Sequence, residues 1–430
     1  MTLRGLAERR WWLGGAVALA ALAAVGPGLP GTATAQSGMD WPQFRFNAAR
    51  TGVTPESLLG TTNVSQLTTR WTAAFGAVSE TSPAVATDSS GTGLVYAGTL
   101  AGSFSAFNAG TGAPVWTDSL GTRGPAGSPA VSRNRVYVAS SAGVLYVLNA
   151  TTGAHVCSVN LRSVIDVSPD VVSAPDGSGP LVLLGGLSHK EWAVFGAGNK
   201  HGECKIDWTF DSVDGFPGTW SSPAFGTDAL GRPVVVFGSK DTDDSVYSVD
   251  VTTGALVWKY QTATVKEQDV GGGPVISAPG TNGLADGAVY IEGKDGVVYA
   301  LDLTTGTKLW SFTVGAPGLS ASSGALAGNA LVIGSDNGVY ALNATTGAML
   351  WHVLKGTMVA SPAVCGPVGQ QVAFIGGAKG NLYALSLATG ATLWKSPTAL
   401  GYFASPAVSQ GQVFAVDRSS VLTAYSLPGT

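Results

Sequence analysis

The stretch VYALDLTTGTKLW, residues 298–310, is one copy of a unit that recurs along the whole chain. Apolar and polar residues alternate before the break at residues 302–306, and the stretch ends on Trp310. It therefore predicts two strands joined by a tight turn. Asp302 and Gly306 suit this turn, because Asp can bond the backbone two residues on and Gly accepts positive φ. Further copies end at Trp116, Cys157, Trp258, Trp351 and Trp394.

A second motif, a small residue followed by Ser-Pro-Ala-Val or a close variant, recurs ahead of each hairpin. Its copies lie at residues 81–85, 127–131, 167–171, 221–225, 272–276, 322–326, 360–364 and 404–408. The tryptophan that ends each unit gives the same count of eight when its substitute, Cys157, is included. Each interval has room for about four short strands, so both counts predict eight β-propeller blades.

The two ends of the repeat array are complementary. Trp71 precedes the first copy of the second motif, whereas the last copy is followed by strands but by no tryptophan. We therefore expect residues 67–75 to complete the eighth blade, which removes open sheet edges. The predicted fold is all-β, an eight-bladed β-propeller of four-stranded antiparallel blades closed by pairing the N- and C-terminal strands. It occupies residues 67–430 and follows an N-terminal arm at residues 36–66.

Residues 1–35 have the composition of an export signal peptide. Arg4, Arg9 and Arg10 precede an apolar run at residues 11–25, and residues 33–35 read Ala-Thr-Ala, which suits a cleavage site. A twin-arginine signal and a basic segment for the general secretory route both explain these residues. We expect a protein that is secreted or periplasmic.

Charge and hydropathy restrict the classes of partner. The formal net charge is −4 and 12% of residues are charged, so the sequence does not favour nucleic acid as a partner. After residue 35, no apolar run approaches the ~18 residues of a membrane span. We expect a monomer without a membrane span.

The three cysteines and the repeating tryptophans are all expected to be packing residues. Cys157, Cys204 and Cys365 are an odd number for an exported chain, and we expect small buried apolar residues without an essential bridge. A link between Cys157 and Cys204 is the one pairing that the sequence leaves open. The repeating tryptophans, one per blade, are predicted to pack between neighbouring sheets.

Taken together, the Ser-Pro-Ala-Val strand, the Tyr-Ala-Leu-Asp hairpin and its tryptophan resemble the repeats of pyrroloquinoline quinone (PQQ) propellers. Residues 41–71, which begin with Trp-Pro and end near Asn-Val-Ser-Gln-Leu, are similar to the opening of quinoprotein alcohol dehydrogenases. The resemblance covers nearly all of the chain after the signal. The superfamily also includes propellers that bind no quinone, such as envelope-assembly scaffolds.

The resemblance implies three residues that would contact the cofactor. Glu80 occupies the place where quinoprotein dehydrogenases keep a glutamate beside the quinone. Trp220 matches a tryptophan whose ring stacks under the flat cofactor, for which a large apolar face is suited. Lys294 matches a basic residue whose charge would stabilise negative charge on the quinone oxygens.

The resemblance also implies a calcium site and a catalytic base. Asp241 falls in the slot of a calcium-binding asparagine, and Glu191 is the acidic candidate for the calcium glutamate in blade three. Asp269 matches the carboxylate that accepts the alcohol proton while hydride passes to the quinone. Two family features are missing, because residues 123–131 lack the adjacent cysteine pair and no CxxCH motif is present.

Two functions follow from these residues. The first is a PQQ- and calcium-dependent dehydrogenase that oxidises a small-molecule or polymer alcohol. The alternative is a non-catalytic propeller that binds an envelope protein or polymer. The enzyme hypothesis predicts that Glu80, Trp220, Asp241, Asp269 and Lys294 converge at the central channel, because every blade's first strand lines the axis.

Overall fold

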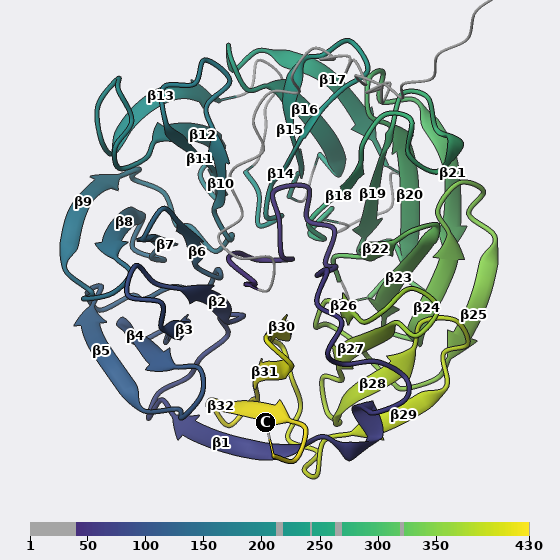
Figure 1. The fold of residues 1–430 in the computed structure, drawn as a ribbon. Helices are drawn as coiled ribbons and strands as arrows, with labels where there is room; N and C mark the ends of the chain where they lie inside the picture. Colours follow the sequence, from purple (N-terminus) through teal and green to yellow (C-terminus); the bar gives the residue numbers. More distant parts are fainter. Residues whose placement is uncertain (1–39, 212–217, 241–242, 263–268, 319–321, 430) are drawn as a thin grey trace, which may run out of the picture.

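The computed structural model describes residues 40–211, 218–240, 243–262, 269–318 and 322–429. These residues form eight four-stranded antiparallel sheets, arranged as the blades of a closed ring (Figure 1). The predicted eight-bladed β-propeller is therefore confirmed. The predicted signal at residues 1–35 lies outside the described residues. In the part of the chain that the structure describes, no helix has the length and apolarity needed to cross a membrane.

Each blade runs from an inner strand at the channel to an outer strand at the circumference (Figure 1). Blades 1 and 2 contain β2 (Ala84–Thr87), β3 (Gly93–Gly98), β4 (Ser103–Asn108) and β5 (Pro114–Ser119), then β6 (Ala130–Ser132), β7 (Arg135–Ala139), β8 (Val144–Asn149) and β9 (His155–Asn160). Blades 3 and 4 contain β10 (Asp170–Ser173), β11 (Pro180–Gly186), β12 (Lys190–Phe195) and β13 (Lys205–Phe210), then β14 (Ala224–Thr227), β15 (Pro233–Gly238), β16 (Ser245–Asp250) and β17 (Leu256–Gln261).

The second half of the ring repeats this order. Blades 5 and 6 contain β18 (Val275–Ser277), β19 (Ala288–Gly293), β20 (Val297–Asp302) and β21 (Lys308–Thr313), then β22 (Ala325–Ala327), β23 (Ala330–Ser335), β24 (Gly338–Asn343) and β25 (Met349–Val353). Blades 7 and 8 contain β26 (Ala363–Cys365), β27 (Val372–Gly376), β28 (Leu382–Ser386) and β29 (Thr392–Lys395), then β30 (Ala407–Ser409), β31 (Gln412–Val416), β32 (Val421–Ser426) and β1 (Thr68–Ala74). The described residues also form two short 3-10 helices, η1 (Val64–Gln66) and η2 (Thr281–Gly283).

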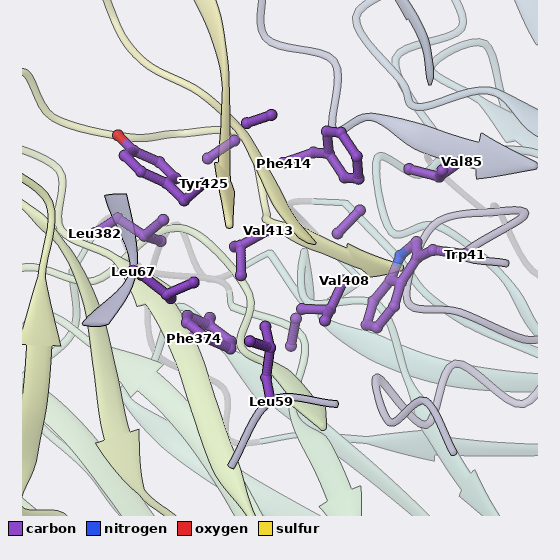
Figure 2. Packing of buried hydrophobic residues seen from close by; sticks show 14 of the residues in the cluster. Trp41, Leu59, Leu67, Val85, Phe374, Leu382, Val408, Val413, Phe414 and Tyr425 are labelled. Carbon is purple, nitrogen blue, oxygen red and sulfur yellow. The ribbon is translucent and has the colours of Figure 1, made fainter. Parts of the chain in front are cut away.

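The ring closes as the tryptophan register predicts. Strand β1 pairs antiparallel with β32, and Trp71 lies opposite Ala424. The N-terminal arm joins the same core, in which Leu59 and Leu67 pack with Phe374 of blade 7 and Val413 of blade 8 (Figure 2). Residues from both ends of the chain therefore bury one continuous apolar cluster.

A tryptophan clasp joins each blade to the next at seven of the eight junctions. Trp258, for example, lies against Gly306 in the turn of blade 5, and its indole Nε1 donates to the Leu303 carbonyl at 2.9 Å. Gly306 has φ of 72°, and a Cβ there would lie 2.6 Å from the indole, so the turn requires glycine. The same Nε1–H bond to a backbone carbonyl is made by Trp71, Trp116, Trp208, Trp310, Trp351 and Trp394. These tryptophans are thus packing residues, as expected.

A disulfide replaces the clasp at the junction between blades 2 and 3. Cys157 stands at the tryptophan position of β9 and is bonded to Cys204, with the two Cα atoms 6.0 Å apart. Cys204 lies in the longer connection that stands in blade 3 where other blades have the Thr-Gly turn. The expectation that all three cysteines are unbridged is therefore wrong for this pair. Cys365 is buried and unbridged.

The N-terminal arm crosses the channel and bonds to all eight blades in order (Figure 1). It begins at Trp41, which exchanges two backbone hydrogen bonds of 2.8 Å with Val85 of blade 1, and continues to Glu56, whose Oε2 accepts from Gly411 of blade 8 at 3.2 Å. In between, oxygens of the arm accept from the inner-strand N–H groups of Val131, Val171, Phe225, Ile276, Leu326 and Val364. The arm thus connects the inner strands of all eight blades through hydrogen bonds.

Two arginines of the arm are buried inside the channel. Arg45 donates to the carbonyls of Pro362 and Gly324. Arg50 donates from Nε to the Pro223 carbonyl at 2.8 Å and from Nη1 to the Phe44 carbonyl at 2.6 Å. Since buried guanidinium groups are costly without acceptors, these carbonyls make the burial tolerable.

Arg50 also lies near an acidic side chain of an inner strand. In the other described inner strands, the same motif position, which is alanine in most blades, has no acidic residue. Asp170 replaces alanine in the motif of blade 3, and its Oδ1 lies 3.9 Å from Arg50 Nη2. Burial raises the pKa of Asp170 to about 7, while Arg50 opposes that rise. The aspartate is therefore the acidic partner of the arm inside the channel.

A ring of serines holds the inner strands together. The backbone N–H of every motif serine except Ser222 donates to the hydroxyl of the corresponding serine in the next blade, at 2.8–3.0 Å. The serines are Ser82, Ser128, Ser168, Ser222, Ser323, Ser361 and Ser405. In blade 5 the position is Gly273, whose N–H donates to Ser323 but which offers no hydroxyl to Ser222. The sequence marks this serine as part of the repeat but does not indicate its role between blades.

Candidate functional site

The candidate site lies where the inner strands begin. We call this end of the channel the mouth and define it by the residue two positions before the motif serine, or before Gly273 in blade 5. In blades 1 to 8 these residues are Glu80, Ala126, Asp166, Trp220, Gly271, Ala321, Val359 and Phe403, of which Ala321 lies outside the described residues. Because these residues precede inner strands that surround one axis (Figure 1), we expect the described mouth residues to lie around that axis.

Three of the predicted residues meet at the mouth between blades 4 and 5. Lys294 Nζ lies 2.6 Å from Asp269 Oδ2 and 4.4 Å from the centroid of the Trp220 ring. The backbone N–H of Lys294 also donates to the Asp269 carbonyl at 3.0 Å. Trp220 precedes β14, Asp269 precedes β18, and Lys294 lies in the turn between β19 and β20. Residues separated in sequence thus form one cluster, the Trp220–Asp269–Lys294 cluster.

The cluster combines a buried carboxylate with an exposed ring. Asp269 is 6% exposed, and the Trp220 side chain is 41% exposed. A large aromatic surface open to solvent is a candidate contact for a ligand. The lysine lies over this surface, so its charge is held between a π face and a carboxylate.

Glu80 does not join this cluster. Glu80 is exposed at the mouth position of blade 1, and no described contact connects it with Trp220, Asp269 or Lys294. Asp241 lies outside the described residues. Their assigned roles in cofactor and calcium binding stay predictions.

Glu191 lies near Thr219, the residue before Trp220, with Gly185 between them. It is fully buried on β12, paired with Gly185, and a Cβ on Gly185 would contact both Glu191 Oε2 and the methyl group of Thr219. Within the described residues, neither oxygen of the Glu191 carboxylate has a hydrogen-bond partner. Burial, with a smaller contribution from Asp170, raises the pKa of Glu191 well above its usual range.

Comparison with known proteins identifies the repeat family. The PQQ-repeat family model (PQQ_2), described as "Outer membrane protein assembly factor BamB", matches residues 63–190 and 242–429. The chain belongs to this PQQ-repeat family. Its curated relatives include outer membrane protein assembly factor BamB from Yersinia pestis, which is 26% identical over 242 residues. The match covers 52% of this chain and 55% of the relative, so the chain spans about half the length of that protein.

Solved structures similar to this PQQ-repeat propeller include a dehydrogenase and an assembly factor. Quinohemoprotein alcohol dehydrogenase from Comamonas testosteroni has a TM-score of 0.70 and 16% identity, over 92% of this chain and 81% of that chain. BamB from Moraxella catarrhalis has a TM-score of 0.61 and 19% identity, over 85% of this chain and 98% of that chain. At such identities both structures show the fold alone.

The donor set of this PQQ-repeat propeller fits a quinone better than it fits calcium. A flat cofactor with anionic groups needs an apolar face and a cation, which Trp220 and Lys294 provide. For calcium, the unpartnered carboxylate of Glu191 is a suitable oxygen ligand, but calcium takes about six to eight oxygens. Among the described residues, no group of three His, Cys, Asp or Glu side chains gathers around one point. The described residues therefore do not make a calcium site by themselves.

The raised pKa of buried Glu191 predicts how the stability of the protein depends on pH. Since the folded pKa of Glu191 is raised, the folded protein keeps a proton that the unfolded chain loses above about pH 4.5. The free energy of unfolding should then fall as pH rises toward neutrality. Glu191→Gln should reduce the slope by about 1.4 kcal/mol per pH unit, measured by urea unfolding between pH 5 and 7. Glu203→Gln, which removes an exposed carboxylate of the same blade, is the control; equal slopes in both variants would contradict the prediction.

Proposed function

We propose that this protein works outside the cytoplasm as a PQQ-binding propeller that oxidises an alcohol. The observation that carries the proposal is the convergence of Trp220, Asp269 and Lys294 at one side of the channel mouth. Each of these residues combines an apt side chain with the position that the family resemblance assigns. The substrate is a small-molecule or polymer alcohol.

Each residue of the cluster would have a distinct role. Trp220 offers a flat apolar face, on which a conjugated ring would stack once Lys294 has moved aside. Lys294 would then hold its charge beside the anionic groups of the ligand. A bound quinone would supply the two-electron acceptor for the hydride of the alcohol.

Asp269 would act as the general base. Its Oδ2 accepts a hydrogen bond from Lys294 Nζ at 2.6 Å, which orients the carboxylate. An ionised carboxylate can accept the hydroxyl proton of the alcohol. Movement of Lys294 would release this oxygen, so cofactor binding and activation of the base would be linked. Glu80 is proposed as a further contact to the quinone, and Glu191 with Asp241 as calcium ligands.

The proposal is tested by adding PQQ, with and without calcium, to the purified protein. A ligand that binds only the folded state stabilises it by about 2.7 kcal/mol at a concentration of 100 times Kd, so the melting temperature should rise. Trp220→Ala should remove that rise. Asp269→Asn should keep most of it while abolishing reduction of an artificial electron acceptor by an added alcohol.

Matched controls separate binding from general effects on stability. Phe403→Ala removes the other exposed ring at the mouth and should leave the PQQ-dependent rise unchanged. A wild-type protein whose melting temperature and absorbance do not respond to PQQ would refute the quinone site. A rise that survives Trp220→Ala would place the quinone elsewhere.

A second candidate function is a propeller that binds an envelope protein and carries out no reaction. The observation in its favour is that Asp269 and Lys294 already neutralise each other while the lysine covers the Trp220 ring. The family description and the Yersinia pestis relative, both assembly factors by name, agree with this role. In that case a cross-linking experiment on intact cells should capture a partner through the mouth, and Trp220→Ala should reduce the capture without any response to PQQ.

A further inference from the structure

A second exposed ring stands at the mouth, across the ring of blades from Trp220. Among the eight mouth residues of the sequence, only Trp220 in blade 4 and Phe403 in blade 8 are aromatic. Their side chains are 41% and 42% exposed. The inner strands that follow them, β14 and β30, lie on opposite sides of the channel (Figure 1).

A cation lies over Phe403 as one does over Trp220. The Cζ atom of Arg418 is 4.6 Å from the centroid of the Phe403 ring. Arg418 belongs to the turn between β31 and β32, and its backbone N–H donates to the Gly401 carbonyl at 3.0 Å. This bond fixes the turn against the segment that carries Phe403. The ring and the guanidinium are therefore held together by the backbone as well as by their own contact.

The two cations differ in their acidic partners. Lys294 is paired with Asp269, whereas no carboxylate in the described part of the chain forms an ion pair with Arg418. The adjacent Asp417 is buried and accepts from the N–H groups of Ser419 and Val421, at 2.8 and 3.2 Å. The Asp417 carboxylate therefore stabilises the turn by accepting backbone hydrogen bonds, and the Arg418 guanidinium has N–H donors left for an external group.

The surroundings of Arg418 add further positive charge. Its Nη1 donates to the Ala378 carbonyl at 3.4 Å, and the next residue, Lys379, is exposed. Glu80, at the mouth position of the neighbouring blade 1, is an acidic group that partly offsets this positive charge on one side. A ligand for this place would present an anion toward blades 7 and 8 and a flat apolar face toward Phe403.

We propose that Phe403 and Arg418 form a binding site for an acidic sugar chain, independent of the quinone site. A sugar ring offers an apolar face of C–H groups to the phenyl ring, and a uronate carboxylate matches the two parallel donors of a guanidinium. A ring that is 42% exposed at an open rim buries little of a small ligand, which normally occupies a concave pocket. A polymer compensates by making several such contacts at once.

The test compares acidic and neutral forms of one sugar chain. Binding of oligogalacturonate to the full chain is measured by calorimetry beside binding of its methyl-esterified form, which has the same rings without the charge. We expect the acidic chain to bind at least tenfold more tightly. Equal binding of both forms, or binding of neither, would overturn the proposal.

Three variants place the interaction on the two residues. Arg418→Gln should weaken binding of the acidic chain at least tenfold, and Phe403→Leu should weaken binding of the same chain several-fold. Arg418→Lys, which keeps the charge but loses the paired donors, should have an intermediate effect and guards against a folding defect in the first variant. Arg123→Gln removes an exposed arginine between β5 and β6 and should leave binding unchanged. Weakening by Arg123→Gln as large as that by Arg418→Gln would show nonspecific charge attraction only.

One further arm distinguishes a polymer from a small aromatic acid. Benzoate carries the same combination of a flat ring and a carboxylate but can make only one set of contacts. We expect benzoate to compete at least a hundredfold more weakly than the oligosaccharide. Competition by benzoate at the concentration of the sugar chain would overturn the assignment of an acidic sugar chain.

Discussion

Replacing Arg50 with alanine is expected to lower the free energy of unfolding by about 3–5 kcal/mol, the usual effect of breaking a buried pair. The arginine donates to carbonyls of blades 3 and 4 and to its own arm, and it lies beside buried Asp170. Its loss leaves acceptors unsatisfied and a carboxylate without its cation. Urea unfolding at constant pH measures the change, and Arg123→Ala, at an exposed arginine, is the control.

A second substitution tests the physical reason for this effect. Asp170→Asn, added to Arg50→Ala, should restore part of the lost stability, because a neutral amide does not need a counter-ion. If the double variant were less stable than Arg50→Ala by the full effect of Asp170→Asn alone, the two residues would act independently. That result would contradict the role of Arg50 as the cation for Asp170.

Breaking the bridge between Cys157 and Cys204 is expected to cost about 2–4 kcal/mol and to lower the melting temperature by several degrees. The bond closes a loop with a sequence separation of 47 and is the only covalent link between the described blades besides the chain itself. The bridge occupies the place where each of the other seven junctions has a tryptophan whose indole packs against the next blade. Differential scanning calorimetry with and without a reductant measures the shift.

The two cysteines provide their own matched control. Cys157→Ala and Cys204→Ala remove the same bond, so each should lower the melting temperature about equally, and the double variant should lower it little further. A reductant should then have no effect on any of the three. Unchanged melting of the wild-type protein under reductant would show that the bond contributes nothing to stability.

The repeats predict the fold because propeller blades are local structures. Each hairpin and each turn glycine is specified by residues within a few positions, and the place of Trp71 ahead of the first motif indicates how the ring closes. The bridge was missed for the opposite reason. In the bridge, Cys157 replaces the tryptophan of one blade and Cys204 lies where the next blade would have its turn. This relation is visible only when the two neighbouring blades are placed side by side.

The candidate site could be predicted in part. Trp220 and Asp269 precede neighbouring inner strands and Lys294 follows the second strand of blade 5, so their meeting agrees with their repeat positions, while the family resemblance selected the residues. The burial of Glu191 and its lack of a partner depend on the packing of Gly185 and Thr219, which no motif encodes. The path of the arm is equally hidden, since Arg45 reaches acceptors 279 and 317 positions away.

The arm across the channel has a consequence for the order of folding. It leaves the ribosome before any blade, yet the acceptor Glu56 Oε2 meets its donor in blade 8 only after 355 further residues. Contacts of such sequence separation form slowly, because chain entropy is lost before they reward it. The last bond of the arm, at Glu56, therefore forms only after blade 8 has been synthesised, whereas Trp41 can pair with Val85 of blade 1 much earlier. Arg45 likewise lacks its Pro362 acceptor until blade 7 has been synthesised. Closure of the ring and completion of the arm should then be one late event, and this event should limit folding, not the formation of the hairpins.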